Sequence, residues 1–451
     1  MFKDNKIIIV DNDQDELNKL ASVIWKEGIA CKAFLYDGLD RPELKGVRVA
    51  FFDINLTNLL APSSSTYDYN NNSSIKDIFH TLAIAIKQYI SIDNGPYALI
   101  FWTSNQQLIN NFKAYMDQKI KDDPIPIPLY ISCIDKSEFI SQESTENNTL
   151  YNIVYGQIKN SPVYLLYDLE KKASQAIIDT INEIHSITSD EEFSWTKPSN
   201  NIRQTFIEIA KATIGEKHVK DHFVEGVIAG INPIINFHME QIINSSQITN
   251  NLFQVTDEEI NSNNFDNLNK KCKLNTIFHI NKNANPCERG AIYKLNHEMI
   301  NEYIGDDTDK TKWIKNLINF KSNQKESSID EIIQNVQVIA VEISPACDFS
   351  QKKDRLLKFI LGIQSPEIDK SLLSSINREY IYYPKTLFID SNSNSNSVFQ
   401  FIFNFNYTMS ISLSNIKSIG NLLFSLKKEY MDMLTTKYAN HIARIGITEF
   451  R

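Results

Sequence analysis

Cysteine is scarce in this chain, and the few cysteines present form no metal-binding or disulfide pattern. The five cysteines lie far apart, and none belongs to a C-x-x-C pair. Zinc ribbons and small disulfide-rich domains need closely spaced cysteines, so both classes are excluded. Dispersed thiols are typical of proteins in a reducing compartment, which predicts a cytoplasmic location.

The chain also lacks an excess of basic residues and any long hydrophobic run. The 46 lysines and arginines are outnumbered by 55 aspartates and glutamates, for a net charge of −9. This balance argues against nucleic-acid binding as the main function. Because no run approaches the ~18 consecutive apolar residues of a membrane span, we expect neither an anchor nor a signal peptide.

The length of 451 residues predicts more than one domain, since ~150 residues is usual for each. The hydrophobic and charged fractions, 42% and 22%, are those of a globular protein. We expect an α/β domain over residues 1–142, a linker helix and helical region over 143–270, and a β-rich domain with a terminal helix over 271–451.

Short β-branched and aromatic runs alternate with helical patterns in the first third. Residues 7–10 form an apolar run too short for a helix, and it ends at Asp11. Asp13 and Glu16 then have the spacing of a capping box, which predicts a helix that ends near Gly28. Further strand-like runs lie at 30–35, 47–52, 97–102 and 128–134. This alternation predicts a doubly wound, five-stranded parallel sheet that binds ligands beyond the carboxyl ends of its strands.

Polar residues follow four of these predicted strands. Asp11 and Asp53 form a paired-carboxylate site for Mg²⁺, which the backbone carbonyl of Asn55 can complete. Thr103 offers a hydroxyl group, and Lys136 offers a positive charge for an anion. Such a set suits transfer of a phosphoryl group onto Asp53 as the nucleophile.

Four segments in this region carry a resemblance to a known family. The sequences VDND at 10–13, FDINL at 52–56, WTS at 102–104 and DKSEF at 135–139 resemble the receiver domain of response regulators. The resemblance implies a flavodoxin-like fold with Asp53 as phosphoacceptor and Asp11 as a metal-site acid. It further implies that Thr103 is the switch hydroxyl and Lys136 the phosphate-sensing lysine, with Mg²⁺ as cofactor and a histidine kinase as partner.

The chain departs from the receiver pattern in three respects. Asn12 stands in place of the second acid, which lowers the expected affinity for Mg²⁺. Ser137 replaces the proline that usually follows the lysine. The intervals from Asp53 to Thr103 and from Thr103 to Lys136 are also long for a receiver. A degenerate receiver that only docks another protein therefore remains an alternative.

The middle of the chain is predicted to be helical. A helix start at Ser161 precedes apolar residues at three- or four-residue spacing up to Ile184. This apolar stripe is typical either of a helix packed on its own domain or of a signalling or dimerising helix. The second interpretation would make the protein a homodimer. His218 and His222 are four residues apart, but they lack the glutamate of the metalloprotease pattern. We therefore expect exposed or hydrogen-bonded histidines there.

The last third is predicted to be an α+β, β-rich module, with a small barrel or sandwich as the expected form. Strands are expected at 276–280 and 336–343, and a hairpin is expected to join 381–389 to 398–405. The leucine spacing from 419 to 444 predicts an amphipathic helix.

Cys347 and Asp348 follow one of these strands. A cysteine nucleophile needs a base, for which His441 or His279 is a candidate. A Cys- or metal-dependent hydrolase in the C-terminal region is therefore a further alternative for the function. The structural interpretation is a buried thiol beside a turn-capping aspartate. Residues 343–348 also resemble a strand-end motif of uncharacterised modules in bacterial conflict systems, which implies a role in antiviral defence.

The sequence thus predicts a cytoplasmic signalling protein rather than an enzyme. Its receiver-like domain is expected to accept a phosphoryl group and to transmit the change to a C-terminal output or docking module. The expected partners are a histidine kinase or another signalling or defence protein.

Overall fold

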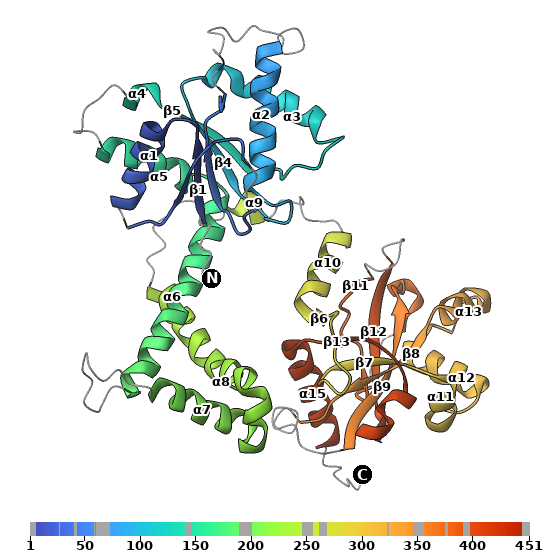
Figure 1. The fold of residues 1–451 in the computed structure, drawn as a ribbon. Coiled ribbons are helices and arrows are strands. Elements are labelled where there is room, and N and C mark those ends of the chain that lie inside the picture. Colours follow the sequence, from blue (N-terminus) through green and yellow to red (C-terminus); the bar gives the residue numbers. More distant parts are fainter. Residues whose placement is uncertain are drawn as a thin grey trace. The chain divides into compact units, whose positions relative to one another are not determined.

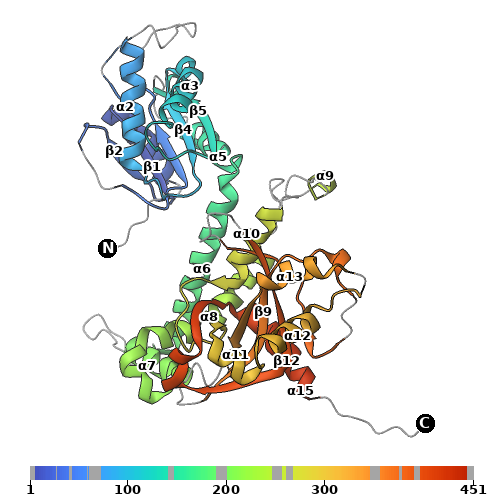
Figure 2. The ribbon, with the colours of Figure 1, turned by 90° about the vertical axis from the view of Figure 1, so that its right-hand side faces the viewer.

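The computed structural model describes residues 6–26, 28–39, 43–57, 59, 73–140, 147–188, 201–245, 256–260, 268–322, 324–345, 356–374, 378–390 and 397–443. The chain forms two compact units, each with its own sheet (Figures 1 and 2). The first unit comprises Met1–Ser186 and Ile234–Val255, and the second comprises Ile187–Pro233 and Thr256–Arg451. The domain boundaries at 142 and 270 stay predictions.

The first unit contains a five-stranded sheet in which every pairing is parallel, in the order β2-β1-β3-β4-β5. The mixed α/β character predicted for this region is therefore confirmed. Its strands are β1 (Ile7–Asp11), β2 (Lys32–Leu35), β3 (Val49–Phe52), β4 (Ala98–Thr103) and β5 (Tyr130–Asp135). Its helices are α1 (Gln14–Lys26), α2 (Ser73–Tyr89), α3 (Ile109–Lys119), α4 (Ser137–Ile140), α5 (Asn147–Lys159) and α6 (Val163–Thr188).

Helices cover both faces of this parallel sheet, α1 and α5 on one face and α2 and α3 on the other (Figure 1). Successive side chains of a strand point to opposite faces. Accordingly, Phe51 packs in the cluster that contains α1 and α5, whereas Phe52 packs with α2 and α3. Since both faces are buried, the central strands are continuously apolar rather than alternating.

Glu170 anchors α6 to the amino-terminal end of the sheet. Its Oε1 accepts hydrogen bonds from Arg48 Nε (3.0 Å) and Nη2 (2.7 Å), and its Oε2 pairs with Lys6. Burial by itself would raise the pKa of Glu170, but the hydrogen bonds from Lys6 and Arg48 hold it below its usual range. Lys6 and Arg48 immediately precede β1 and β3, so the helix is bound to two central strands.

We expect Glu170→Gln to loosen the first turns of α6, because the two cations would lose their shared carboxylate. Hydrogen exchange of peptides from α6 should show protection reduced by about 1–2 kcal/mol. Asp93→Asn serves as the control, since it breaks an exposed pair with Lys45 (3.2 Å) and should cost less than ~0.5 kcal/mol. Equal protection of α6 in both variants would contradict the anchoring role.

The second unit contains an eight-stranded sheet whose pairings are antiparallel, in the order β10-β12-β9-β8-β7-β13-β6, with β11 paired to β12. Its strands are β6 (Ile280–Asn281), β7 (Ala291–Leu295), β8 (Gln337–Glu342), β9 (Leu356–Pro366), β10 (Ile381–Tyr382), β11 (Phe388–Ile389), β12 (Val398–Ser412) and β13 (Gly420–Leu426). The predicted hairpin is confirmed, since Phe388 pairs with Phe399 and Ile389 with Val398.

Helices pack on both faces of this antiparallel sheet as well, so the expected barrel or sandwich is wrong. Residues of α11 (His297–Tyr303) and α12 (Asp307–Ile318), with α13 (Glu326–Gln334), form one core. Residues of α15 (Lys428–Ile442) form the core of the opposite face. The other helices described are α7 (Asn201–Ile214), α8 (Glu216–Ser245), which continues into the first unit, α9 (Asp257–Ile260) and α10 (Leu268–His279).

Two predicted elements of this unit differ from the structure. Residues 276–279, predicted as part of a strand, end helix α10, whose Cys272 and Thr276 are buried one turn apart. The helix predicted over 419–444 begins only at Lys428, because the leucines before it belong to β13, which pairs with β7 and β6. In both cases pairing and packing outweigh local preference.

Helix α6 begins near the predicted position, with the Ser161 hydroxyl accepting a hydrogen bond from the Val163 N–H (3.2 Å). The apolar stripe of α6 is only partly buried. Ile184 is buried, whereas the side chains of Leu165 and Leu169 are 46% and 43% exposed. None of the helices in the described parts of the chain has the length and apolar content to cross a membrane.

Candidate functional site

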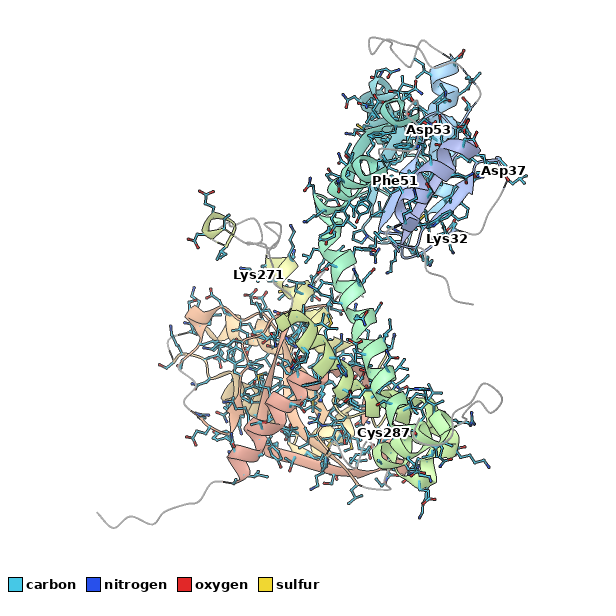
Figure 3. The ribbon with its side chains drawn as sticks, turned by 90° about the vertical axis from the view of Figure 1, so that its left-hand side faces the viewer. Lys32, Asp37, Phe51, Asp53, Lys271 and Cys287 are labelled. Carbon is cyan, nitrogen blue, oxygen red and sulfur yellow. The ribbon has the colours of Figure 1, made fainter. Side chains whose placement is uncertain are left out.

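Four residues predicted from the sequence meet at the carboxyl edge of the parallel sheet. Asp11 and Thr103 end β1 and β4, and Asp53 and Lys136 directly follow β3 and β5. Figure 3 labels Asp53 within the first unit. Each of the four is at most 5% exposed. The Lys136 Nζ lies 2.7 Å from Asp53 Oδ2 and 3.4 Å from Asp11 Oδ2. The strand order thus brings together residues that are up to 125 positions apart in the sequence.

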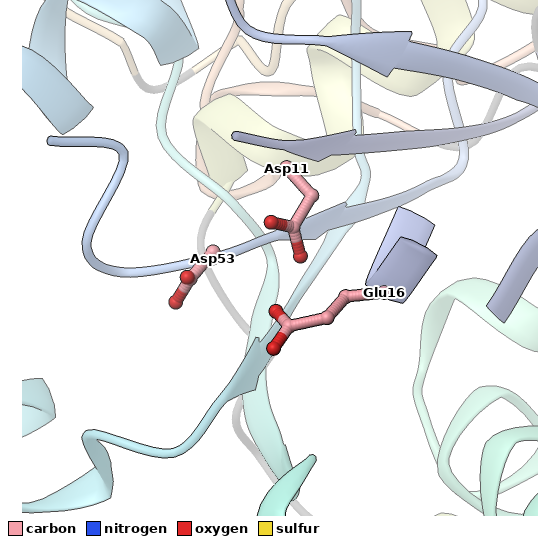
Figure 4. A group of neighbouring side chains, drawn as sticks. All are labelled: Asp11, Glu16 and Asp53. Carbon is pink, nitrogen blue, oxygen red and sulfur yellow. The ribbon is translucent and has the colours of Figure 1, made fainter. Parts of the chain in front are cut away.

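A third carboxylate, that of Glu16, also pairs with the Lys136 ammonium. The capping-box spacing predicts that the side chains of Asp13 and Glu16 both bind backbone N–H groups at the start of α1. The structure confirms this for Asp13 but not for Glu16. Asp13 does cap the helix, since its Oδ1 accepts hydrogen bonds from the N–H groups of Asp15 (2.9 Å) and Glu16 (3.1 Å). The Asp13 N–H, however, donates to Asp11 Oδ1 (2.9 Å). The Glu16 carboxylate lies with those of Asp11 and Asp53 in the site (Figure 4).

A signal in the sequence could have identified Glu16. It precedes Leu20 by four residues and Val23 by seven, which places it on the buried stripe of α1. A glutamate on such a stripe, at the end of the helix nearest to the carboxyl edge of the sheet, has to find a polar partner there.

The loop after β3 is held by its own side chains. Asn55 Oδ1 accepts from the N–H (3.2 Å) and the hydroxyl (2.7 Å) of Thr57, and the Asn55 N–H donates to Asp53 Oδ1 (3.3 Å). Asn12 Nδ2 donates to the Thr57 carbonyl (3.3 Å). The Asn12 side chain, at the position of the missing acid, thus binds the loop. Because the Asn55 side-chain oxygen is engaged by Thr57, the backbone carbonyl of Asn55 stays the predicted ligand for a cation.

Thr103 is placed by the turn that follows β4. Its hydroxyl accepts from the Asn105 N–H (3.1 Å), and its carbonyl accepts from the Lys136 N–H (3.3 Å). Within the residues that the structure describes, no hydrogen bond joins the Thr103 hydroxyl to Asp53. Thr103 therefore lies at the predicted edge of the sheet, with its hydroxyl engaged in a local turn.

The electrostatics of the site follow from its burial and its excess of acids. Burial raises the pKa of Asp11 to about 7; the Lys136 charge opposes the rise, and the Asp53 and Glu16 charges add to it. Burial would lower the pKa of Lys136, but Asp53, Asp11 and Glu16 outweigh it and raise that pKa. Lys136 therefore stays charged, and Asp11 holds a proton more readily than an ordinary aspartate.

The donor set fits a hard divalent cation. Oxygen atoms of Asp11, Glu16 and Asp53 lie within 4.8 Å of one another, and Figure 4 shows the three carboxylates together. Over the described ranges, no other group of three or more His, Cys, Asp or Glu side chains could hold a metal. All-oxygen donors suit Mg²⁺ or Ca²⁺ rather than Zn²⁺. One ammonium cannot balance three carboxylates, and a divalent cation would supply the missing charge.

Of the alternative catalytic residues, the structure describes only the two histidines, His279 and His441. Cys347 and Asp348 lie outside the described residues. His441 Nε2 is 3.1 Å from Asn406 Oδ1, whereas the ring of His279 packs 5.5 Å from that of Tyr430. His441 also lines a cavity of about 1660 Å³ in the second unit. Three acidic and three basic side chains line this cavity: Glu367, Asp369, Glu379, Arg378, Lys385 and Lys437. This even balance of charge favours neither an anionic nor a cationic ligand.

Two histidines of the middle region have carboxylate partners. His222 Nδ1 lies 2.9 Å from Glu225 Oε2, and His238 Nε2 lies 2.9 Å from Glu183 Oε2. The site at the edge of the parallel sheet is thus the candidate with the most convergent chemistry. Comparisons of the chain with family models, with curated proteins and with solved structures found no match.

Proposed function

We propose that the first unit is a receiver-like signalling domain that accepts a phosphoryl group on Asp53 and passes the change to the second unit. The donor is a histidine kinase, and the cation is Mg²⁺. The observation that carries the proposal is the contact of Lys136 Nζ with Asp53 Oδ2 (2.7 Å), beside the buried Asp11. Asp53 supplies a carboxylate nucleophile, Lys136 a positive charge for the phosphoryl oxygens, and Asp11 a further ligand for the cation.

The topology supports the same proposal. The order β2-β1-β3-β4-β5 is that of flavodoxin-like folds, which bind ligands where the strand order reverses, between β1 and β3. Asp11 ends β1 and Asp53 follows β3, so the two carboxylates stand at that switch point. The site is therefore where this class of sheet places its ligands.

Each residue has a defined task in the proposed reaction. A carboxylate oxygen of Asp53 attacks phosphorus, an O–P bond forms, and the N–P bond of the phosphohistidine breaks with its electron pair left on the imidazole nitrogen. Asp11, Asp53 and the Asn55 carbonyl would hold the cation, which would neutralise charge on the phosphoryl oxygens. Lys136 binds a phosphoryl oxygen and so senses the modified state.

The test is to incubate the full chain with Mg²⁺ and a small donor such as acetyl phosphate. We expect one hydroxylamine-sensitive label per chain, because an acyl phosphate is cleaved by hydroxylamine, and we expect Asp53→Asn to lose it. Asp37→Asn, at an exposed aspartate after β2, should keep the label. A wild-type chain without label, or a label retained by Asp53→Asn, would sink the proposal in favour of a docking module that works without phosphorylation.

The second unit is proposed as the output or docking module. The proposed role in antiviral defence rests only on the resemblance of residues 343–348, part of which lies outside the described residues. A cytoplasmic location and a signalling or defence partner belong to the same proposal.

A further inference from the structure

We infer that Glu16 is a positioning residue that receives the Lys136 ammonium when a divalent cation enters the site, and so lets lysine and cation be bound together. This inference rests on the cation site of the proposed function, at Asp11 and Asp53. It concerns how this chain accommodates two positive groups in one buried site.

The Lys136 ammonium contacts the same carboxylate oxygens that a cation would bind. An ammonium group has three N–H donors, and here three carboxylates accept from it. Two of them are Asp11 and Asp53. A cation that binds these two acids must therefore displace the ammonium from them.

The displaced ammonium needs a new anionic partner close by. Beside a divalent cation it is repelled, and a buried charge without a partner is costly. Glu16 already touches the ammonium, so Lys136 can move toward Glu16 without losing its last ion pair. The Glu16 side chain is 21% exposed, whereas those of Asp11 and Asp53 are 0% and 6% exposed, so Glu16 has the most room to follow the ammonium.

The neighbouring polar residues cannot take this role. Asn12 is neutral and binds the Thr57 carbonyl, and Asp13 is committed to the N–H groups at the start of α1. The same cap fixes the first turn of α1 and thereby the position of Glu16. Asp15 lies on that turn but is exposed.

The experiment measures Mn²⁺ binding to the full chain by electron paramagnetic resonance, which needs no phosphorylation. Glu16→Gln should weaken Mn²⁺ binding about tenfold, as is usual when the partner of a neighbouring charge is removed from a metal site. Glu16→Asp should weaken it as well, because the shorter side chain does not reach Lys136. Asp15→Asn, which removes an exposed acid of the same turn, should leave the affinity unchanged.

A double-mutant cycle separates positioning from direct ligation. In a Lys136→Met background there is no ammonium to receive, so adding Glu16→Gln should change Mn²⁺ affinity less than ~2-fold. Lys136→Gln replaces Lys136→Met if the latter does not fold. The same tenfold loss in this background would make Glu16 a direct ligand and overturn the inference.

Two further outcomes distinguish this inference from the proposed function. If wild-type protein binds Mn²⁺ and Glu16→Gln binds it equally well, the role of Glu16 is overturned and the cation site stands. If no variant binds Mn²⁺, or if Asp11→Asn binds it like wild type, the cation site fails and the role of Glu16 fails with it.

Discussion

Replacement of Lys136 by methionine is expected to destabilise the cation-free first unit by about 3–5 kcal/mol at pH 8, the usual cost of removing one partner from a buried ionic group. Lys136 is the only ammonium in contact with Asp11, Glu16 and Asp53 among the residues that the structure describes. Without it, three carboxylates would repel one another in a largely buried space. Methionine retains most of the side-chain volume, so the loss reports charge rather than packing.

The measurement is hydrogen exchange of peptides from β1 and β3 in the presence of a chelator, because a global unfolding curve would mix the two units. Mg²⁺ should restore most of the lost protection, since the cation replaces the missing positive charge. Lys45→Met is the matched control: Lys45 is 65% exposed and pairs with the exposed Asp93, so its replacement should cost less than ~0.5 kcal/mol. A Lys136→Met variant as stable as Lys45→Met would show that the carboxylates do not depend on the lysine.

The second large effect is the loss of stability of the cation-free protein as the pH rises. The pKa of Asp11 is about 7 in the folded chain, against an ordinary value of 3.8. Between these two pH values the folded state binds more protons than the unfolded state, so the free energy of unfolding falls with rising pH. We expect a fall of about 2–4 kcal/mol between pH 4 and pH 7 from this group. The raised pKa of Lys136 acts only at strongly alkaline pH, outside this window.

Asp11→Asn provides the control for the pH effect, because asparagine does not titrate. Hydrogen exchange of β1 and β3 peptides, corrected for the intrinsic rate at each pH, should show the fall in wild type and a much smaller one in the variant. Mg²⁺ should oppose the fall and bind more tightly above pH 7, where Asp11 gives up its proton more easily. Protection that is constant or rises from pH 4 to pH 7 in the chelated wild type would refute the assignment.

The parts of the first unit that the sequence predicts well are those where burial dictates composition. Continuous apolar runs such as that of β1 occur where both faces of a strand are covered, so strand positions and the polar residues after them could be predicted. Asp11, Asp53, Thr103 and Lys136 were found in this way. The local pattern is weaker in the second unit, where β-branched residues end helix α10 and leucines at helical spacing form β13.

The sequence by itself determined which strands the first unit has and which residues end them, because a strand buried on both faces must be apolar until it reaches the edge of the sheet. Only the tertiary structure decided that Glu16 turns away from the helix cap and joins Lys136. Its spacing to Asp13 satisfies a local rule, but its carboxylate is drawn to an ammonium that lies 120 positions later in the chain. Local patterns determine the elements, whereas the partners of a buried charge depend on which strand ends the fold brings together.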